Sequence, residues 1–224
     1  MSKLWVYGCS FASGHGVLGS DHDNMLQDKY GYIQIPEGCF GKFCADELGM
    51  ELQLQAVSGT SNFNILDSLY QDVESMDNDD IVIIMWTYPD RTLFYDEQDR
   101  PHHCIATLAD SGLSKTYYEE IYSERRSKTE TTSLILAANQ LLIGRGIKII
   151  NTTFWQTQVH GLAWFFNRKL LRESNIRFPE CMLYRTITNN ETFACYDGYH
   201  PSLETHKEYG LRLAKYIREK YEQD

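Results

Sequence analysis

The hydrophobic and polar positions of the chain form two kinds of segment that alternate along its length. Short apolar runs typical of β-strands occur at 4–7, 52–57, 81–86 and 147–151. The third run, IVIIMW, is apolar at every position, as expected for a parallel strand covered on both faces. Helical spacing of apolar residues follows in three places: Ile65, Leu66, Leu69, Val73 and Met76; Leu134, Ala137, Ala138, Leu141 and Leu142; and Gly210, Leu213, Ala214, Ile217 and Tyr221, after Pro201 and Ser202. This alternation predicts an α/β domain with a central parallel sheet and helices on both faces.

The segment 95–128 departs from this pattern. It is polar and aromatic without a clean period, so we expect an insertion that is partly helical. Such segments in compact domains serve as lids or binding loops, or are solvated excursions, and the sequence leaves both readings open. No internal repeat or interdomain linker is evident, which predicts a single domain over residues 1–224.

The amino-acid composition limits which ligands the protein can bind and where in the cell it is expected. The chain has 224 residues, 42% hydrophobic, which is enough for one sizeable core. Its formal charge of −10 and the lack of a basic stripe argue against a nucleic-acid partner. The sequence shows neither a signal-peptide pattern nor a membrane-length apolar run, so we expect a cytoplasmic protein. Six cysteines without C-x-x-C pairs are expected to be reduced and mostly buried, and the oligomeric state is not indicated.

Two signals compete in VYGCSFASGHGVLG near the N-terminus. Gly14, Gly16 and Gly19 spell G-x-G-x-x-G, but Gly14 lies six residues after Gly8 and no helix start follows Gly19. We therefore interpret these glycines as loop residues and expect no dinucleotide cofactor. Ser10, directly after the first strand, fits its context better.

Polar residues follow each predicted strand, and the ligands of open α/β sheets bind at the carboxyl ends of the strands. These segments are residues 8–10, 58–62, 87–91 and 152–155, to which YDGYHPS adds Asp197 and His200 before the last helix. A serine hydroxyl becomes nucleophilic when an imidazole takes its proton, and a carboxylate fixes the imidazole tautomer. Ser10, His200 and Asp197 supply these roles.

The segments GCSFASG, AVSGTSN, IVIIMWT and DGYHP resemble, in order, the four blocks of the SGNH hydrolase superfamily, also called GDSL esterases. The resemblance spans nearly the whole chain. It implies a flavodoxin-like three-layer fold and hydrolysis of acyl esters through an acyl-enzyme, without metal or organic cofactor. It also implies that Ser10 is the nucleophile, His200 the base and Asp197 its orienting carboxylate, with the N–H groups of Ser10 and Gly59 as oxyanion donors.

The chain departs from the family pattern at two positions. Cys9 stands where an aspartate usually precedes the serine, and Pro89 stands where the third block usually has an asparagine that donates to the oxyanion. In these respects the chain resembles divergent members, some of them virus-encoded. Asn62 is our candidate for the missing donor, with an N-cap of the following helix as the alternative role. Thr87 or Tyr88 would be the next candidate.

Several other residues have two readings. Arg91 pairs with acidic neighbours or holds an anionic substrate, and His160 is an alternative base or a substrate contact. A metal site from Asp21, His22, Asp23, His102 and His103 lacks zinc-motif spacing, so we expect solvated loops there. Six aromatic residues either stack on sugars or belong to the core: Trp86, Trp155, Trp164, Tyr88, Tyr117 and Tyr118.

The sequence thus predicts a serine esterase acting on a small-molecule or carbohydrate acyl ester, with carbohydrate O-deacetylation as one form of this activity. Because the block-three asparagine is missing, a catalytically weak or inactive ligand-binding protein remains an alternative. A second alternative is an acyl transferase with the same triad.

Overall fold

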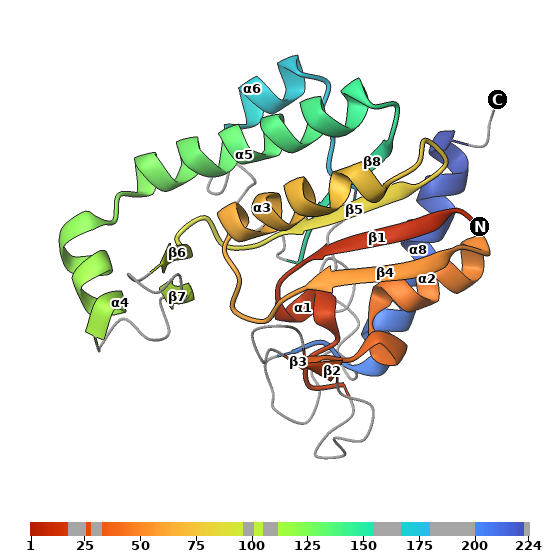
Figure 1. Ribbon diagram of the computed structural model, residues 1–224, viewed down its shortest axis with the longest axis horizontal. Coiled ribbons are helices and arrows are strands. Elements are labelled where there is room, and N and C mark those ends of the chain that lie inside the picture. The colour runs from red at the N-terminus through yellow and green to blue at the C-terminus, as the bar shows by residue number, and fades with distance from the viewer. Residues whose placement is uncertain are drawn as a thin grey trace.

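The structure is a computed structural model that describes residues 1–17, 26–27, 33–95, 101–104, 112–154, 167–179 and 200–221. Within these residues the chain forms an α/β domain built on a parallel sheet (Figure 1). The strands lie in the order β4 (Glu51–Ala56), β1 (Lys3–Gly8), β5 (Ile81–Trp86) and β8 (Lys148–Thr153). The predicted fold class and the strand runs are therefore confirmed.

The strands of this sheet are parallel and in continuous register. Leu4 of β1 pairs with Leu52 of β4 and with Ile81 of β5, and Trp86 at the end of β5 pairs with Thr153 of β8. Because the strands run in one direction, the segments that follow them meet at one edge of the sheet. The strand order places the topological switch point, where open α/β sheets bind ligands, between β1 and β5.

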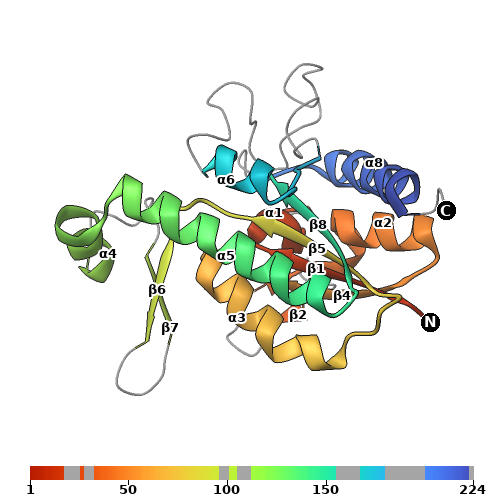
Figure 2. The ribbon, with the colours of Figure 1, turned by 90° about the horizontal axis from the view of Figure 1, so that it is seen from above.

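Helices cover both faces of the sheet and give three layers (Figure 2). One face carries α2 (Phe40–Leu48) and α8 (Leu203–Tyr221), and the other carries α3 (Asn62–Asp72) and α5 (Glu124–Gly144). Side chains alternate along each strand, so Val6 and Ile83 join the core under α2 and α8, while Tyr7 and Ile84 join the core under α3 and α5. Two hydrophobic cores therefore hold the sheet from opposite sides.

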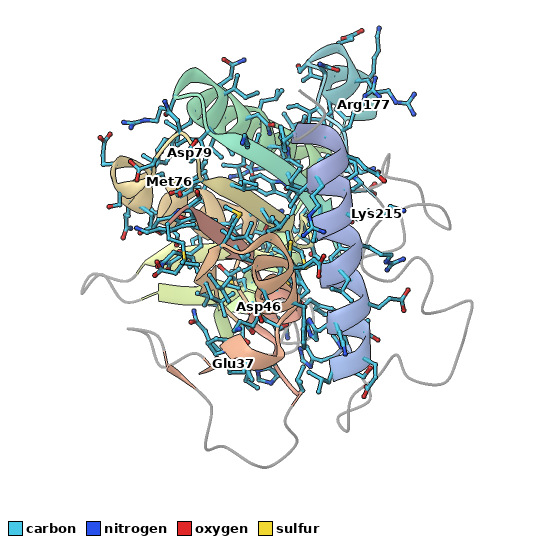
Figure 3. All side chains as sticks on the ribbon, turned by 90° about the vertical axis from the view of Figure 1, so that its right-hand side faces the viewer. Glu37, Asp46, Met76, Asp79, Arg177 and Lys215 are labelled. Carbon is cyan, nitrogen blue, oxygen red and sulfur yellow. The ribbon has the colours of Figure 1, made fainter. Side chains whose placement is uncertain are left out.

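The last helix begins where the sequence signals it. The Ser202 hydroxyl accepts a hydrogen bond from the N–H of Thr205 (3.3 Å), which satisfies one of the free donors at the start of α8. Gly210 allows α8 to approach α2 closely, because a Cβ at this position would lie 2.4 Å from the carbonyl oxygen of Phe40. Figure 3 shows α8 along this flank beside α2, which carries Asp46.

The predicted insertion contains regular structure where it is described. β6 (Thr92–Tyr95) and β7 (Pro101–Cys104) form an antiparallel hairpin, followed by α4 (Gly112–Thr116) and a π-helical turn (Tyr117–Ile121). These elements project from the sheet on the side where β5 ends (Figures 1 and 2). α5 begins at Glu124, inside this range, which was expected to be partly helical. His102 and His103 lie on strand β7, so the expectation of a loop there is wrong.

The remaining described elements are short. They are α1 (Ser10–Ser13), β2 (Leu26–Gln27), β3 (Ile33–Gln34), two 3₁₀ turns (Pro36–Gly38 and Val73–Ser75) and α6 (Arg168–Glu173). The described cysteines are buried free thiols, as expected: Cys9, Cys39, Cys44 and Cys104. Among the described residues, no helix combines the length and the apolar character needed to cross a membrane.

Candidate active site

The chain turns sharply between β1 and α1, and Ser10 is the first residue of that helix. Gly8 makes the turn possible, since a Cβ there would lie 2.6 Å from the Cβ of Ala12. Cys9, which replaces the usual aspartate, is fully buried, and Ser10 is 8% exposed. The carbonyl of Ser10 accepts hydrogen bonds from the Ser13 hydroxyl (3.1 Å) and the His15 N–H (3.2 Å). These bonds fix the backbone of the proposed nucleophile.

His15 is a residue that the sequence analysis missed. Its Nδ1 lies 3.3 Å from the Ser58 hydroxyl, and its ring centroid lies 4.7 Å from that of His200. His15 therefore links three segments of the carboxyl edge: the turn after β1, the loop after β4 and the segment before α8. Its place five residues after Ser10, between two glycines, is the sequence signal that could have indicated it.

A row of aromatic rings continues across the same edge. Phe11 stacks on Phe154 (4.1 Å between centroids) and lies 5.3 Å from the ring of His200. Phe154 in turn meets the edge of Tyr88 at 5.1 Å. The structure thus places Phe11, which follows Ser10, in one row of ring contacts with His200 and with Tyr88 of the loop after β5.

The two main-chain N–H groups expected to be oxyanion donors belong to Ser10 and Gly59. The N–H of Ser10 has no partner within its own helix because Ser10 is its first residue. Gly59 has a left-handed backbone (φ 76°). Neither N–H donates to a main-chain carbonyl of the described residues.

Asn62 holds two segments together. Its Nδ2 donates to the carbonyl of Thr87 (3.1 Å) and to the hydroxyl of Thr131 (3.3 Å), while its Oδ1 accepts from the N–H of Thr87 (2.8 Å). Both amide hydrogens are thus engaged within the protein. The N-cap alternative for Asn62 is wrong, because Ser61 caps α3 by accepting from the N–H of Asn64 (3.2 Å).

The loop after β5 carries Thr87, Pro89 and Arg91. The Arg91 guanidinium lies over the ring of Tyr88, 5.4 Å from its centroid, and forms no ion pair with any described carboxylate. Burial raises the pKa of Asp90, an effect that the charge of Arg91 opposes. Burial also raises the pKa of Tyr88. The charge of Arg91 thus favours the ionised form of its acidic neighbour Asp90, and both readings of Arg91 stay open.

A third histidine of this region, after His15 and His200, is His206. His206 is completely buried on α8, and its Nδ1 accepts a hydrogen bond from the N–H of Phe40 (3.2 Å). Burial, with a smaller effect of nearby His200, lowers the pKa of His206 to about 3. Its neutral ring is a structural acceptor for the start of α2.

Several predicted residues lie outside the described part of the chain: Asp197, His160, Trp155, Trp164, Asp21, His22 and Asp23. Within the described part, no cluster of His, Cys, Asp and Glu could hold a metal ion. Trp86 is 1% exposed and donates to Asn151 (2.9 Å), so it belongs to the core. Tyr117 is also buried, and the Tyr118 hydroxyl donates to the carbonyl of Asp90 (3.1 Å).

Comparison with known proteins gives a result at the level of fold. Neither a family model nor a curated protein sequence matches the chain. Among solved structures, the esterase EstA from Pseudoalteromonas sp. is similar over 100% of both chains, with a TM-score of 0.58 and 11% identity. A lipolytic protein of the G-D-S-L family from Desulfitobacterium hafniense covers 96% of this chain and 99% of its own, with a TM-score of 0.58 and 13% identity.

The acetylxylan esterase Axe2 from Geobacillus stearothermophilus is a third similar structure. It has a TM-score of 0.56 and 16% identity, and the match covers 97% of this chain and 93% of Axe2. These likenesses extend over the whole domain, and the sequence motifs occur in the matching order. The chain therefore has the α/β fold of the SGNH hydrolases, with Ser10 at the carboxyl edge of its sheet.

Proposed function

We propose that the protein is a serine esterase that uses Ser10 as nucleophile and His200 as general base. The observation that carries the proposal is the meeting of Ser10, Ser58–Gly59 and His200 at one edge of the sheet, through the contacts of Phe11 and His15. Asp197, three residues before His200 in the sequence, is proposed to orient the imidazole. A binding role alone would not require a serine at this turn.

In the proposed reaction, the Ser10 hydroxyl oxygen attacks the ester carbonyl carbon while His200 accepts the hydroxyl proton. The tetrahedral intermediate carries its negative charge on the former carbonyl oxygen, where the N–H groups of Ser10 and Gly59 donate. The C–O bond to the alcohol then breaks, and His200 returns the proton to the departing oxygen. Water hydrolyses the acyl-serine by the same steps, releasing the acid and free Ser10.

The third oxyanion donor of the family has no equivalent at Pro89. Since both amide hydrogens of Asn62 are bonded to Thr87 and Thr131, we propose that Asn62 braces the loop after β5 in the resting protein. The Thr87 hydroxyl is buried and has no hydrogen-bond partner among the described residues, which makes it the donor candidate on this loop. With two main-chain donors alone, we expect a slower enzyme than one with three.

The proposed substrate is a small-molecule or carbohydrate acyl ester. Acetylxylan esterases are among the proteins of similar fold, which favours a short acyl group on a sugar. The formal charge of −10 agrees with a substrate other than nucleic acid.

The test is covalent labelling combined with turnover. The protein is treated with a fluorophosphonate, the modified residue is found by mass spectrometry, and acetyl and longer acyl esters are screened in parallel. We expect an adduct on Ser10 that is lost in Ser10→Ala and kept in Ser133→Ala, a change at an exposed serine of α5. An adduct with acyl transfer to an added alcohol would identify a transferase. No adduct and no turnover would favour a binding protein.

A further inference from the structure

The loop that follows β5 contains an unusual group of buried polar atoms. Thr87 Oγ1, Asp90 Oδ1 and Arg91 Nη1 are each buried and have no hydrogen-bond partner among the described residues. Buried polar atoms are nearly always bonded, so three exceptions within five residues require an explanation. Other polar groups of the same loop do have partners: Asn62 bonds the main chain of Thr87, and Tyr118 donates to the carbonyl of Asp90.

This loop lies next to the proposed nucleophile. β5 pairs directly with β1, so the loop after β5 and the turn that carries Ser10 leave adjacent strands at the switch point of the sheet. Tyr88, beneath the Arg91 guanidinium, contacts Phe154, and Phe154 stacks on Phe11, the residue after Ser10. Residues 88–91 are half-buried, so the loop also reaches the surface.

The chemistry of the three atoms selects among ligands. Arg91 Nη1 can only donate, the carboxylate oxygen of Asp90 accepts, and the Thr87 hydroxyl does both. An anionic ligand would satisfy Arg91 but would lie beside the carboxylate of Asp90. A hydroxyl group both donates and accepts, and two neighbouring hydroxyls would satisfy a guanidinium and a carboxylate together. Asp90 and Arg91 also have opposite charges, which suits a neutral ligand.

We propose that the loop 87–91 is a subsite for the vicinal hydroxyl groups of a neutral polyol, with Arg91 donating to one hydroxyl and Asp90 accepting from its neighbour. This proposal names the alcohol part of the substrate and in that respect rests on the proposed function. If Ser10 cleaves esters, the bound polyol is the alcohol that the reaction releases. The half-buried ring of Tyr88 supplies the adjoining apolar surface. Sugars and glycerol share the required hydroxyl pattern, and the experiment separates them.

The first arm of the experiment measures selectivity. The value of kcat/KM is determined for a monoacetylated methyl xyloside, glycerol monoacetate and 4-nitrophenyl acetate, which has no vicinal hydroxyls. We expect Arg91→Gln and Asp90→Asn each to lower the ratio of polyol ester to aryl ester by about tenfold or more. Arg125→Gln, at an exposed arginine of α5, is the matched control and should leave the ratio unchanged. An unchanged ratio in both loop variants would overturn the proposal.

The second arm does not depend on hydrolysis. Binding of methyl β-xyloside and of glycerol to Ser10→Ala is measured by ligand-observed NMR, with and without Arg91→Gln. Binding that weakens in the double variant supports the subsite even if no ester is cleaved, in which case the esterase proposal alone fails. Absence of binding to both polyols, or hydrolysis restricted to acetylated uronates, would overturn the polyol subsite. The preferred polyol in the two arms identifies the source as a sugar or a glyceride.

Discussion

An aspartate lies near each end of strand β5, and the two carboxylates differ in their hydrogen bonds. At the amino end, Asp80 is 1% exposed and accepts three hydrogen bonds, from the N–H of Lys3 (2.7 Å), the indole of Trp5 (2.9 Å) and the N–H of Asp77 (3.2 Å). At the carboxyl end, Asp90 has a buried oxygen without a partner among the described residues. The first carboxylate ties together neighbouring segments of the fold, whereas one oxygen of the second has no hydrogen-bond partner among the described residues.

This difference separates structural from functional polar groups. A buried carboxylate with its acceptor sites filled stabilises the fold and has little capacity to bind anything else. A partly buried carboxylate with an open site costs stability unless water or a ligand completes it. Uncharged polar groups show the same contrast: Asn139 and Asn151 bond each other within the core, whereas Thr87 Oγ1 in the loop after β5 has no partner among the described residues. Mutations at the carboxyl end of β5 should therefore lower activity, and mutations at its amino end should lower stability.

The largest effect is expected at the carboxyl edge. Ser10→Ala and His200→Ala should each reduce ester hydrolysis by about 10³-fold or more, because nucleophile and base act as one unit. The melting temperature should change little, since neither side chain is a main component of the core clusters. Steady-state kinetics and thermal melting of the same preparations measure both quantities.

Asp197→Asn should keep the fold and lose turnover, because an amide favours the wrong imidazole tautomer. His160→Ala should have a smaller effect than His200→Ala. Activity at the wild-type level in Ser10→Ala would exclude the mechanism and leave the carboxyl edge as a binding site.

The amino end of β5 should behave in the reverse way. Asp80→Ala leaves the N–H of Lys3 and the indole of Trp5 without their acceptor, so we expect the free energy of unfolding to fall by about 3 kcal/mol. The value of kcat should remain near that of the wild type at temperatures where the variant is folded. Urea unfolding measures the first quantity, and Asp79→Ala, at the exposed neighbour in the same turn, is the control (Figure 3). If both variants unfold alike, the carboxylate of Asp80 has no structural role.

The sequence predicted the elements whose pattern is local. The apolar run IVIIMW coincides with β5, and Pro201 and Ser202 correctly mark the start of α8. α2 was not predicted, because its buried face includes Gly41, Cys44 and Ala45, small residues that give a weak apolar period. The hairpin of β6 and β7 was missed since its pairing, Phe94 with His102, depends on contacts across a turn.

The candidate site shows the same limit. The order of the four blocks predicted Ser10 and His200 as site residues, but His15 was missed because its contacts with Ser58 and His200 join residues far apart in the sequence. The bonds of Asn62 were missed for the same reason, since Thr87 and Thr131 lie 25 and 69 residues away. The open atoms of the loop 87–91 are defined by the lack of partners in space, which no sequence pattern reports.

Asn62 is a structural residue by its hydrogen bonds, and it holds the loop that is proposed to bind ligand. We expect its substitution to change the free energy of unfolding by an intermediate amount. Asn62→Ala removes the acceptor of the Thr87 N–H, which is buried, so we expect a loss of about 2 kcal/mol in unfolding free energy. As a brace it would change kcat modestly, whereas an oxyanion donor would change kcat by about 10²-fold or more at constant stability. Asn78→Ala, at an exposed asparagine before β5, is the control for melting and kinetics. A large loss of kcat with an unchanged melting temperature would restore the donor role.

The smallest expected effect concerns pH and the scaffold beneath the site. Burial lowers the pKa of His206 to about 3 in the folded protein, whereas an unfolded histidine titrates near ~6.5. Between these values the unfolded chain binds a proton that the folded protein does not, so stability falls as the pH decreases from about 6.5 towards 3. From pH 7 to 5.5 this one histidine should reduce the unfolding free energy by about 1 kcal/mol.

His206→Asn isolates this contribution, because its amide oxygen can still accept from the N–H of Phe40. Urea unfolding of both proteins at pH 7 and 5.5 gives the difference, and the wild type should lose more stability than the variant by that amount. Equal losses would mean that His206 takes up a proton while buried. In that case a group that changes charge would lie beneath the carboxyl edge of the sheet. Structural polar groups would then no longer differ from those of the loop 87–91 in the way described above.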